Sequence, residues 1–268
     1  MTLYFYGKSD IGRKRATNQD NFLNMRICDN IMLFVLCDGM GGTNGGNIAS
    51  GLATRTYSDF IENTLAPYIG DDGSCDLESV DLEGVIRDAV VAANRAVYAR
   101  ARENSELANM GTTLVSAVIC GNEMYIANVG DSRMYMLCDD LLSQLTHDHS
   151  YVQMLVDMGQ ITKEEAATNP RRNILTRAVG TEKTIEVDIT SMEIPESDVY
   201  FLLCSDGLYN FMTEDDMKSI MSSSLEGYDD DYDAELSEKV KTLIDRANEN
   251  GGGDNITIIL VRQPDANN

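Results

Sequence analysis

The sequence predicts an α+β fold whose sheets are antiparallel. Residues 112–120 and 123–129 are two β-prone runs joined by the turn dipeptide Gly121-Asn122, a pattern typical of a hairpin. No helix alternates with these strands, as a doubly wound parallel sheet would require. Strong helical periodicity occurs instead in a separate stretch, residues 82–102.

The first strands lie near the start of the chain. Residues 31–37 are consecutive apolar residues, too few for a buried helix and rich in β-prone side chains, so they predict a buried strand. We expect residues 21–27 to form a strand that leads into a hairpin with 31–37. Residues 3–6 are expected to form the first strand of the chain.

Two amphipathic helices are expected next. Residues 47–65 carry apolar side chains at helical spacing, and an acidic loop at 68–81 separates them from a second helix at 82–102. The apolar stripe of this second helix predicts core packing and not a cofactor site. It consists of Leu82, Val85, Ile86, Ala89, Val90, Ala93 and Val97.

The second half of the chain continues the same mixture of elements. Strands are expected at 133–138, 185–189, 199–204 and 256–261, the first of them after a tight turn at 130–132. Helices are expected at 214–221 and 234–248, with an acidic surface loop at 228–233 between them. No internal repeat or linker divides the chain, so residues 1–268 are expected to form one domain.

Residues 147–178 are polar and irregular, with short helices expected at 150–158 and 162–167. A long connection of this kind is more often functional than idle. Although the protein as a whole is acidic, this segment has a local excess of positive charge, which comes from Lys163, Arg171, Arg172 and Arg177.

The formal charge of -23 limits the partners of the protein. Its average field would repel nucleic acid and anionic membranes, so neither is expected as a partner. A phosphorylated substrate would be repelled too and needs local positive charge. The cysteines include no Cys-x-x-Cys pair, the chain starts without a leader pattern, and no apolar run approaches membrane-spanning length. We expect a monomer in the cytoplasm with reduced thiols.

Three aspartates stand beside glycines at the ends of predicted buried strands, and they are Asp38, Asp206 and Asp254. A single Asp-Gly pair is most often a turn. Three carboxylates brought together in a dry site, however, would repel one another strongly unless a shared cation compensated them. The three together therefore favour a metal site, and its oxygen ligands suit Mg²⁺ or Mn²⁺ better than Zn²⁺.

Other kinds of site are less well supported. The glycine-rich stretch after Asp38 lacks the Gly-Lys-Ser/Thr of a P-loop, and Asn44 stands where a dinucleotide-binding fingerprint needs its third glycine. His147 and His149 have no thiolate or third histidine in the sequence nearby to complete a zinc site. The acidic run 229–233 lacks the glycine and glutamate of a calcium loop.

A site in which several aspartates hold cations is suited to the hydrolysis of a phosphate monoester. The uncatalysed reaction is so slow that enzymes accelerate it by up to ~10²¹-fold, whereas general acid–base catalysis contributes only about 10²–10⁴-fold. Two cations can activate a water molecule and neutralise charge on the phosphoryl oxygens. The cationic run 13–15 includes Arg15, and the planar fork of an arginine suits two phosphate oxygens at once.

Eight short motifs follow one another along nearly the whole chain, at residues 10–20, 38–42, 111–113, 128–133, 148–150, 176–180, 205–208 and 253–257. With these motifs in this order, the sequence closely resembles the metal-dependent serine/threonine protein phosphatases of the type 2C family, in their compact bacterial form. Any one motif would be weak evidence. The complete series is specific.

The resemblance implies a sandwich of two antiparallel sheets flanked by helices (α/β/β/α), with a dinuclear Mn²⁺ or Mg²⁺ site at one end. In it Asp38 would bridge the two ions, and Asp206 and Asp254 would complete the first ion. The backbone carbonyl of Gly39 would serve the second ion, and Asp20 would act on that ion through water.

The resemblance also implies roles at the edge of this site. Arg15 would hold the substrate phosphate and so, with Asp38, be catalytic. Asp131 matches the position that binds a third, weaker ion in bacterial members. Residues 147–178 correspond to a mobile flap beside the site, so its arginines are candidates for contacting the substrate protein.

Two residues depart from the pattern of many relatives. Gln19 stands where these relatives have a glutamate that helps to hold the second metal, which predicts a weaker or more hydrated site. Met40 replaces the histidine that animal relatives place after Asp-Gly to protonate the leaving group. A water molecule on a metal ion would then have to supply that proton.

The leading hypothesis is a bacterial signalling hydrolase that removes phosphate from serine and threonine residues of proteins. It would use metal-activated water, form no phosphoenzyme, and oppose a serine/threonine kinase. One alternative is a catalytically weak or silent relative that binds phosphoprotein partners as a regulator, although the three strand-end aspartates are all present. Another is a phosphatase of the same fold dedicated to a single anti-sigma-type regulator.

Overall fold

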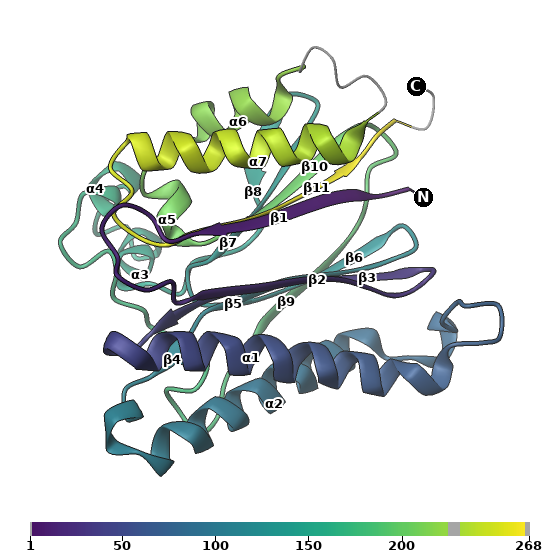
Figure 1. Cartoon of the computed structure of the whole chain (residues 1–268), viewed down its shortest axis with the longest axis horizontal. Coiled ribbons are helices and arrows are strands. Elements are labelled where there is room, and N and C mark those ends of the chain that lie inside the picture. The colour runs from purple at the N-terminus through teal and green to yellow at the C-terminus, as the bar shows by residue number, and fades with distance from the viewer. Residues whose placement is uncertain (1, 225–230, 266–268) are drawn as a thin grey trace.

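The computed structural model describes residues 2–224 and 231–265, and its strands form two antiparallel sheets that pack face to face (Figure 1). The first sheet has the order β1 (Tyr4–Asp10), β11 (Ile256–Gln263), β10 (Val199–Cys204), β7 (Arg133–Cys138) and β8 (Leu141–Gln144). The second has the order β2 (Asp20–Cys28), β3 (Ile31–Met40), β5 (Leu114–Cys120), β6 (Glu123–Val129) and β9 (Asp188–Glu193), and β4 (Gly111–Thr112) pairs with β3. This arrangement confirms the expected α+β sandwich.

Helices cover the outer face of each sheet, which gives four layers (Figure 1). The second sheet is covered by α1 (Gly42–Leu65) and α2 (Leu82–Glu103), and the first by α6 (Glu214–Ser222) and α7 (Tyr232–Glu249). Shorter helices gather at one end of the sandwich: α3 (Tyr151–Asp157), α4 (Lys163–Ala167) and α5 (Asp206–Tyr209). Single 3-10 turns are η1 (Ala66–Tyr68), η2 (Leu77–Ser79) and η3 (Ser105–Leu107). Among the described residues, no helix is both long and apolar enough to span a bilayer.

Strand β3 is buried on both faces, and this explains its continuous apolar sequence. Leu33 and Val35 face the cluster formed with α1 and α2, whereas Phe34 faces the cluster between the sheets, where it meets residues such as Phe201. A third cluster joins α7 to the outer face of the first sheet. Free thiols account for all six cysteines, as expected, and five of these are buried in the fold.

Helix α1 begins at Gly42 and not at residue 47, so the predicted start was wrong. Glycine is a poor helix former, which is why the sequence indicated a turn here. The glycines instead permit close packing. A Cβ on Gly39 would collide with the carbonyl oxygen of Gly46, and one on Gly46 would collide with the side chain of Gln19. Contacts with β2 and β3 therefore outweigh the low local helix propensity.

Strand β9 occupies Asp188–Glu193, so the prediction of 185–189 was also misplaced. Its residues lie at the edge of the second sheet and are mostly polar and exposed, whereas Ile185 and Val187 are apolar because they pack against the α1–α2 cluster. The turn at 130–132 leads from β6 in the second sheet to β7 in the first, so these consecutive strands are not paired. The short elements β4, β8 and α5 had no clear sequence signal.

The predicted acidic loop at 228–233 falls partly outside the described residues, which omit 225–230. Its last part was assigned wrongly. The carboxylate of Asp231 accepts a hydrogen bond from the backbone N–H of Ala234 and caps α7, which begins at Tyr232.

Residues 147–178, here called the flap, are fastened to the sandwich at their start, and their end is tied back to that start. The backbone N–H of His149 donates to the carbonyl of Gly130 at 2.9 Å, and the N–H of Thr176 donates to the carbonyl of His149 at 2.8 Å. The expected short helices are present as α3 and α4, capped by Ser150 and Thr162. The flap therefore starts and ends beside the β6–β7 turn.

Candidate metal centre and active site

Four aspartates from the two sheets, Asp20, Asp38, Asp206 and Asp254, lie close enough to repel one another. Asp38 lies near the end of β3, and Asp20, the first residue of β2, is its direct partner in the antiparallel register. Asp206 begins α5 directly after β10, and Asp254 precedes β11. Because β10 and β11 are neighbours, their aspartates come to the same edge of the first sheet.

These side chains surround a cleft of about 400 Å³. Its wall contains Asp38, Asp131, Asp206, Asp254, Arg15, Gly39, Met40, Gln19, Thr113, Asn173 and other residues of the glycine-rich stretch and the flap. The structure therefore brings together the predicted residues from both sheets and from the loop before β2. Asp20 lies behind this wall, since it does not line the cleft.

Burial and mutual repulsion raise the pKa values of four carboxyl groups in and beside the cleft, those of Asp20, Asp38, Asp131 and Asp206. For Asp38 the largest cause is burial, followed by the charges of Asp20 and Asp206, and its pKa lies well above the usual value. The pKa of Asp206 is raised in the same way, by burial and then by Asp131 and Asp254. Burial raises the pKa of Asp20 to about 6 and that of Asp131 to about 7. Without a cation, the protein holds negative charge here at a cost.

Two buried carboxylate oxygens have no hydrogen-bond partner, namely Oδ1 of Asp20 and Oδ1 of Asp206. Buried polar atoms are nearly always satisfied, so these two oxygens are suited to act as donors to a cation or to its water molecules. Oxygen donors of this kind suit Mg²⁺ or Mn²⁺. Among the described residues, no three His, Cys, Asp or Glu side chains by themselves form a complete metal cage. Carbonyl oxygens or water molecules would have to share the coordination, as they commonly do for Mg²⁺.

Asp20 is held by two hydroxyl groups. Ser205 Oγ donates to its Oδ2 at 2.8 Å, and Thr257 Oγ1 donates to the same oxygen at 2.6 Å. These bonds fix the carboxylate and leave Oδ1 free. Sequence reasoning did not identify either hydroxyl residue, although both lie in motifs that it singled out. Their chemistry is too common to stand out.

Arg15 reaches the cleft from the loop between β1 and β2. Its guanidinium donates to Oδ2 of Asp254 at 2.6 Å, and its side chain remains 49% exposed. This hydrogen bond raises the pKa of Arg15, so the group stays positively charged. Arg15 thus lies at the mouth of the cleft, where an anionic substrate would arrive.

Asn255 positions the loop that carries Arg15, a role that the sequence did not predict. Its Nδ2 donates to the carbonyls of Ile11 and Thr17 at 2.9 and 3.1 Å, and its Oδ1 accepts from the backbone N–H of Gln19 at 2.8 Å. The loop is therefore tied to the residue next to Asp254, which Arg15 contacts.

The two unusual residues, Gln19 and Met40, both line the cleft. Gln19 Nε2 donates to the carbonyl oxygen of Gly42 at 2.6 Å, so this side chain helps to hold the start of α1. Met40 offers a thioether, which cannot act as a proton donor.

The comparisons with known proteins agree with this geometry. The family model described as protein phosphatase 2C matches residues 7–243. The chain belongs to the protein phosphatase 2C family. A serine/threonine phosphatase of Listeria monocytogenes is 40% identical over 256 residues, which cover 96% of this chain and 94% of that one.

Solved structures of serine/threonine phosphatases are also similar to this chain in fold. Stp1 of Staphylococcus aureus has a TM-score of 0.84 at 33% identity, over 98% of this chain and 96% of that one. The catalytic domain of the phosphatase PstP, solved in complex with two manganese ions, has a TM-score of 0.78 at 32% identity over 97% of each chain. As a member of this protein phosphatase 2C family, the chain is a serine/threonine protein phosphatase.

Proposed function

We propose that the chain hydrolyses phosphoserine and phosphothreonine in proteins with two divalent metal ions, Mn²⁺ or Mg²⁺, in the aspartate cleft. The observation that carries this proposal is the convergence of buried, mutually repelling carboxylates, two of them with unsatisfied oxygens, opposite Arg15. When bound, the ions would lower the pKa of a water molecule and neutralise charge on the phosphoryl group.

The aspartates have distinct roles in this proposal. Asp38 would serve both ions, Asp206 and Asp254 would help to hold the first, and the carbonyl oxygen of Gly39 would help to hold the second. Asp20, which its hydroxyl partners fix behind the cleft wall, would orient water around the second ion. A further, weaker ion would bind at Asp131 together with Asp206.

The chain's own side chains bind and orient the substrate. Arg15 would contact two phosphate oxygens while Asp254 keeps its guanidinium in place. The described residues that line the cleft include no His, Cys or Lys, which are frequent nucleophiles and general acids, and the proposal assigns the aspartates of the cleft to the metal ions. This composition supports direct attack by water without a phosphoenzyme.

The wider setting is also a proposal. The substrates would be proteins phosphorylated by a serine/threonine kinase, with nucleic acid and membranes excluded as partners by the charge of -23. Free cysteines support a cytoplasmic location. We propose that residues 1–268 form one monomeric catalytic domain with the flap at 147–178.

Hydrolysis of a phosphothreonine peptide tests the proposal directly. We expect turnover with Mn²⁺, loss of turnover with a chelator, and loss in Asp38→Asn under both conditions. Activity that survives chelation and Asp38→Asn would contradict the metal mechanism. Tight peptide binding without turnover would favour a silent regulator instead, and a panel of phosphopeptides would show whether the enzyme serves one substrate or many.

A further inference from the structure

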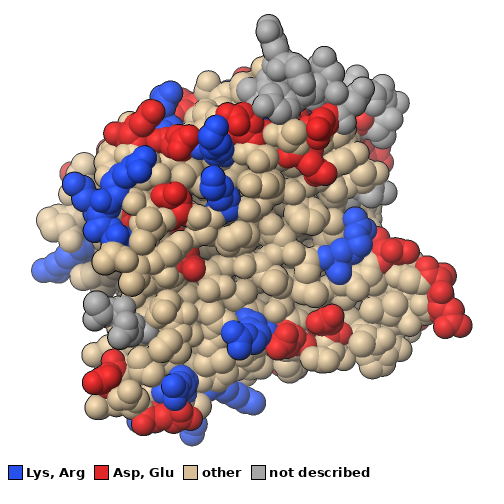
Figure 2. Space-filling model, in the orientation of Figure 1, with Lys and Arg blue, Asp and Glu red and all other residues tan. Residues whose placement is uncertain are grey.

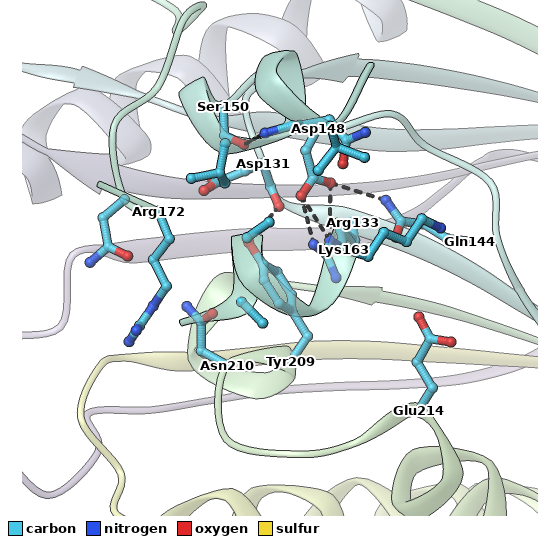
Figure 3. A pocket seen from close by; sticks show the side chains of 16 residues that line it. Asp131, Arg133, Gln144, Asp148, Ser150, Lys163, Arg172, Tyr209, Asn210 and Glu214 are labelled. Carbon is cyan, nitrogen blue, oxygen red and sulfur yellow. Dashed lines mark hydrogen bonds and ion pairs between the residues drawn. The ribbon is translucent and has the colours of Figure 1, made fainter. Parts of the chain in front are cut away.

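A second cavity, of about 240 Å³, lies between the flap and the body of the sandwich (Figure 3). The flap side is built from α3, α4 and residues 172–173, and the body side from β7, α5 and the start of α6. Asp131 and Asn173 line both this cavity and the aspartate cleft. The two spaces are therefore neighbours, and a peptide held in one would reach the other.

One ion pair in the cavity is already complete. Arg133 donates from Nε and Nη2 to the carboxylate of Asp148 at 3.0 and 2.7 Å, and Gln144 Nε2 donates to the same carboxylate at 3.0 Å. The guanidinium of Arg133 also lies 3.7 Å from the ring centroid of Tyr209. These groups form a satisfied, rigid floor and have little charge left to offer a ligand.

Two other cations of the cavity have no such partner. Lys163, from α4, and Arg172, from the segment after it, both line the space, and no ion pair or side-chain hydrogen bond of either is found within the described residues. On the opposite wall, Glu214 stands in the first turn of α6, where its negative charge interacts favourably with the helix N-terminus. Glu164, next to Lys163 in α4, interacts with the charge of Lys163 but forms no ion pair with it. The flap wall of the cavity therefore carries two cations without an ion-pair partner in the part of the chain that the structure describes.

Exposed lysines and arginines usually serve only to keep a surface hydrated. Here, however, the chain carries a net charge of -23, and an anionic substrate must approach against that field. Figure 2 shows Lys and Arg side chains gathered at the end of the molecule that holds the short helices. Lys163 and Arg172, which have no ion-pair partner among the described residues, line one partly open cavity beside the catalytic cleft. This placement indicates a ligand.

We propose that this cavity binds an anionic side chain of the substrate protein next to its phosphorylated residue, and this inference rests on the proposed function. The anionic group would be a carboxylate or a second phosphate. Lys163 supplies a mobile charge, and Arg172 supplies a planar fork that suits two oxygens. The volume suits one side chain with a few water molecules. The flap would thus select substrates by an acidic residue near the phosphorylation site.

Binding measurements with non-hydrolysable peptides test this subsite independently of turnover. Three peptides would carry a phosphonate analogue of phosphothreonine, flanked by glutamines, by glutamates or by a second phosphoserine analogue. Their Kd values would be measured with Mn²⁺ for the unmodified chain, for Lys163→Gln, Arg172→Gln and the double variant. Arg87→Gln, on α2 away from the flap, is a control that matches the loss of charge in each single variant.

We expect the unmodified chain to bind the anionic peptides about three- to tenfold more tightly than the neutral one. The double variant should lose this preference and bind the neutral peptide as before, whereas Arg87→Gln should keep it. Comparison of the two anionic peptides shows whether carboxylate or phosphate is the better ligand.

Several results would overturn the subsite. These are no preference in the unmodified chain, a preference that persists in the double variant, or an equal loss in Arg87→Gln, which would reflect net charge alone. An equal loss in Arg171→Gln, outside the cavity, would reflect the general field of the flap. Failure of the proposed function would be seen in a different experiment. The chain would then not hydrolyse a neutral phosphothreonine peptide in the presence of Mn²⁺, regardless of the ratio of Kd values between anionic and neutral peptides.

Discussion

Asp206 shows at the scale of a single residue how the fold retains a costly charge for function. One of its oxygens accepts from Asn210 Nδ2 at 3.1 Å, and the other is buried without a partner. Its carboxylate also repels Asp131 and Asp254. A residue selected for stability alone would not be placed here, because an unsatisfied buried polar atom costs about 1–3 kcal/mol.

Asp206→Asn should therefore have opposite effects on the stability of the metal-free protein and on its binding of metal. In a chelator we expect its melting temperature to equal or exceed that of the unmodified chain, because a repelling charge is removed. Its stabilisation by Mn²⁺ should be largely lost, and activity should fall by at least about 100-fold, since even residues that only support metal ligands contribute 10–100-fold. Thermal unfolding with and without Mn²⁺ measures the first two effects. A variant that is less stable in chelator yet stabilised normally by Mn²⁺ would contradict this account.

Arg15→Lys tests whether Arg15 binds phosphate through its fork or only through its charge. Lysine keeps the positive charge but cannot donate to two phosphate oxygens and to Asp254 in the same planar geometry. We expect KM for a phosphothreonine peptide to rise about tenfold, which corresponds to about 1.4 kcal/mol, with Mn²⁺ affinity unchanged. Steady-state kinetics and a Mn²⁺ titration check this. An unchanged KM would show that position 15 contributes charge alone.

At the scale of elements, the attachment of the flap to the sandwich depends on one buried histidine, His149. The backbone N–H of Gly130 donates to His149 Nδ1 at 3.0 Å, while the other ring nitrogen lies 3.0 Å from Asp188 Oδ2. Burial lowers the pKa of His149, which favours the neutral ring that can accept at Nδ1. His149 therefore joins the start of the flap, the β6–β7 turn and the edge strand β9.

His149→Ala should loosen this junction. It leaves the buried N–H of Gly130 without an acceptor, so we expect a loss of about 1–3 kcal/mol in the free energy of unfolding and a lower melting temperature in chelator. Limited proteolysis should cleave the flap faster. His147→Ala removes an exposed ring paired with Asp157 and should change stability by no more than about 0.5 kcal/mol. Equal effects of the two variants would argue against a special role for His149.

The elements also show which parts of the structure the sequence could predict. Strand β3 was predictable because it is buried on both faces, and α2 because one face of it packs against the core while the other meets solvent. The start of α1 was not predictable, since its glycines are required by backbone contacts with β3 and not by local preference. Strand β9, mostly exposed at an edge, had no apolar pattern of its own.

The site was predicted for a related reason. Aspartates beside glycines at strand ends are unusual in combination, so Asp38, Asp206 and Asp254 could be selected from sequence, and the structure places all three around one cleft. Hydrogen-bonding partners such as Ser205 and Asn255 escaped notice, because their importance arises only when distant segments fold together.

At the scale of the whole molecule, the aspartate cluster makes stability depend on both pH and metal. Carboxyl groups whose pKa is raised in the folded state stabilise the fold fully below the unfolded value of about 3.9, and this contribution is lost as pH rises through the folded pKa. For Asp20 and Asp131 the loss extends to about pH 6 and 7, and for Asp38 and Asp206 the folded pKa also lies well above the ordinary value. The cluster therefore makes the chelated protein less stable as pH rises from 5.5 to 8.

Mn²⁺ should reverse this trend, because an ion that replaces protons binds more tightly as pH rises. We expect the difference in melting temperature between Mn²⁺ and chelator to increase from about pH 5.5 to 8. Taking the difference removes the opposite effect of His149, whose lowered pKa makes stability fall as pH drops below about 6.5. Asp38→Asn, which lacks the proposed bridging carboxylate, should show little difference at any of these pH values. A difference that is constant with pH would mean that the carboxylates carry no excess protons in the metal-free fold, and that the cleft is not organised around the capture of cations.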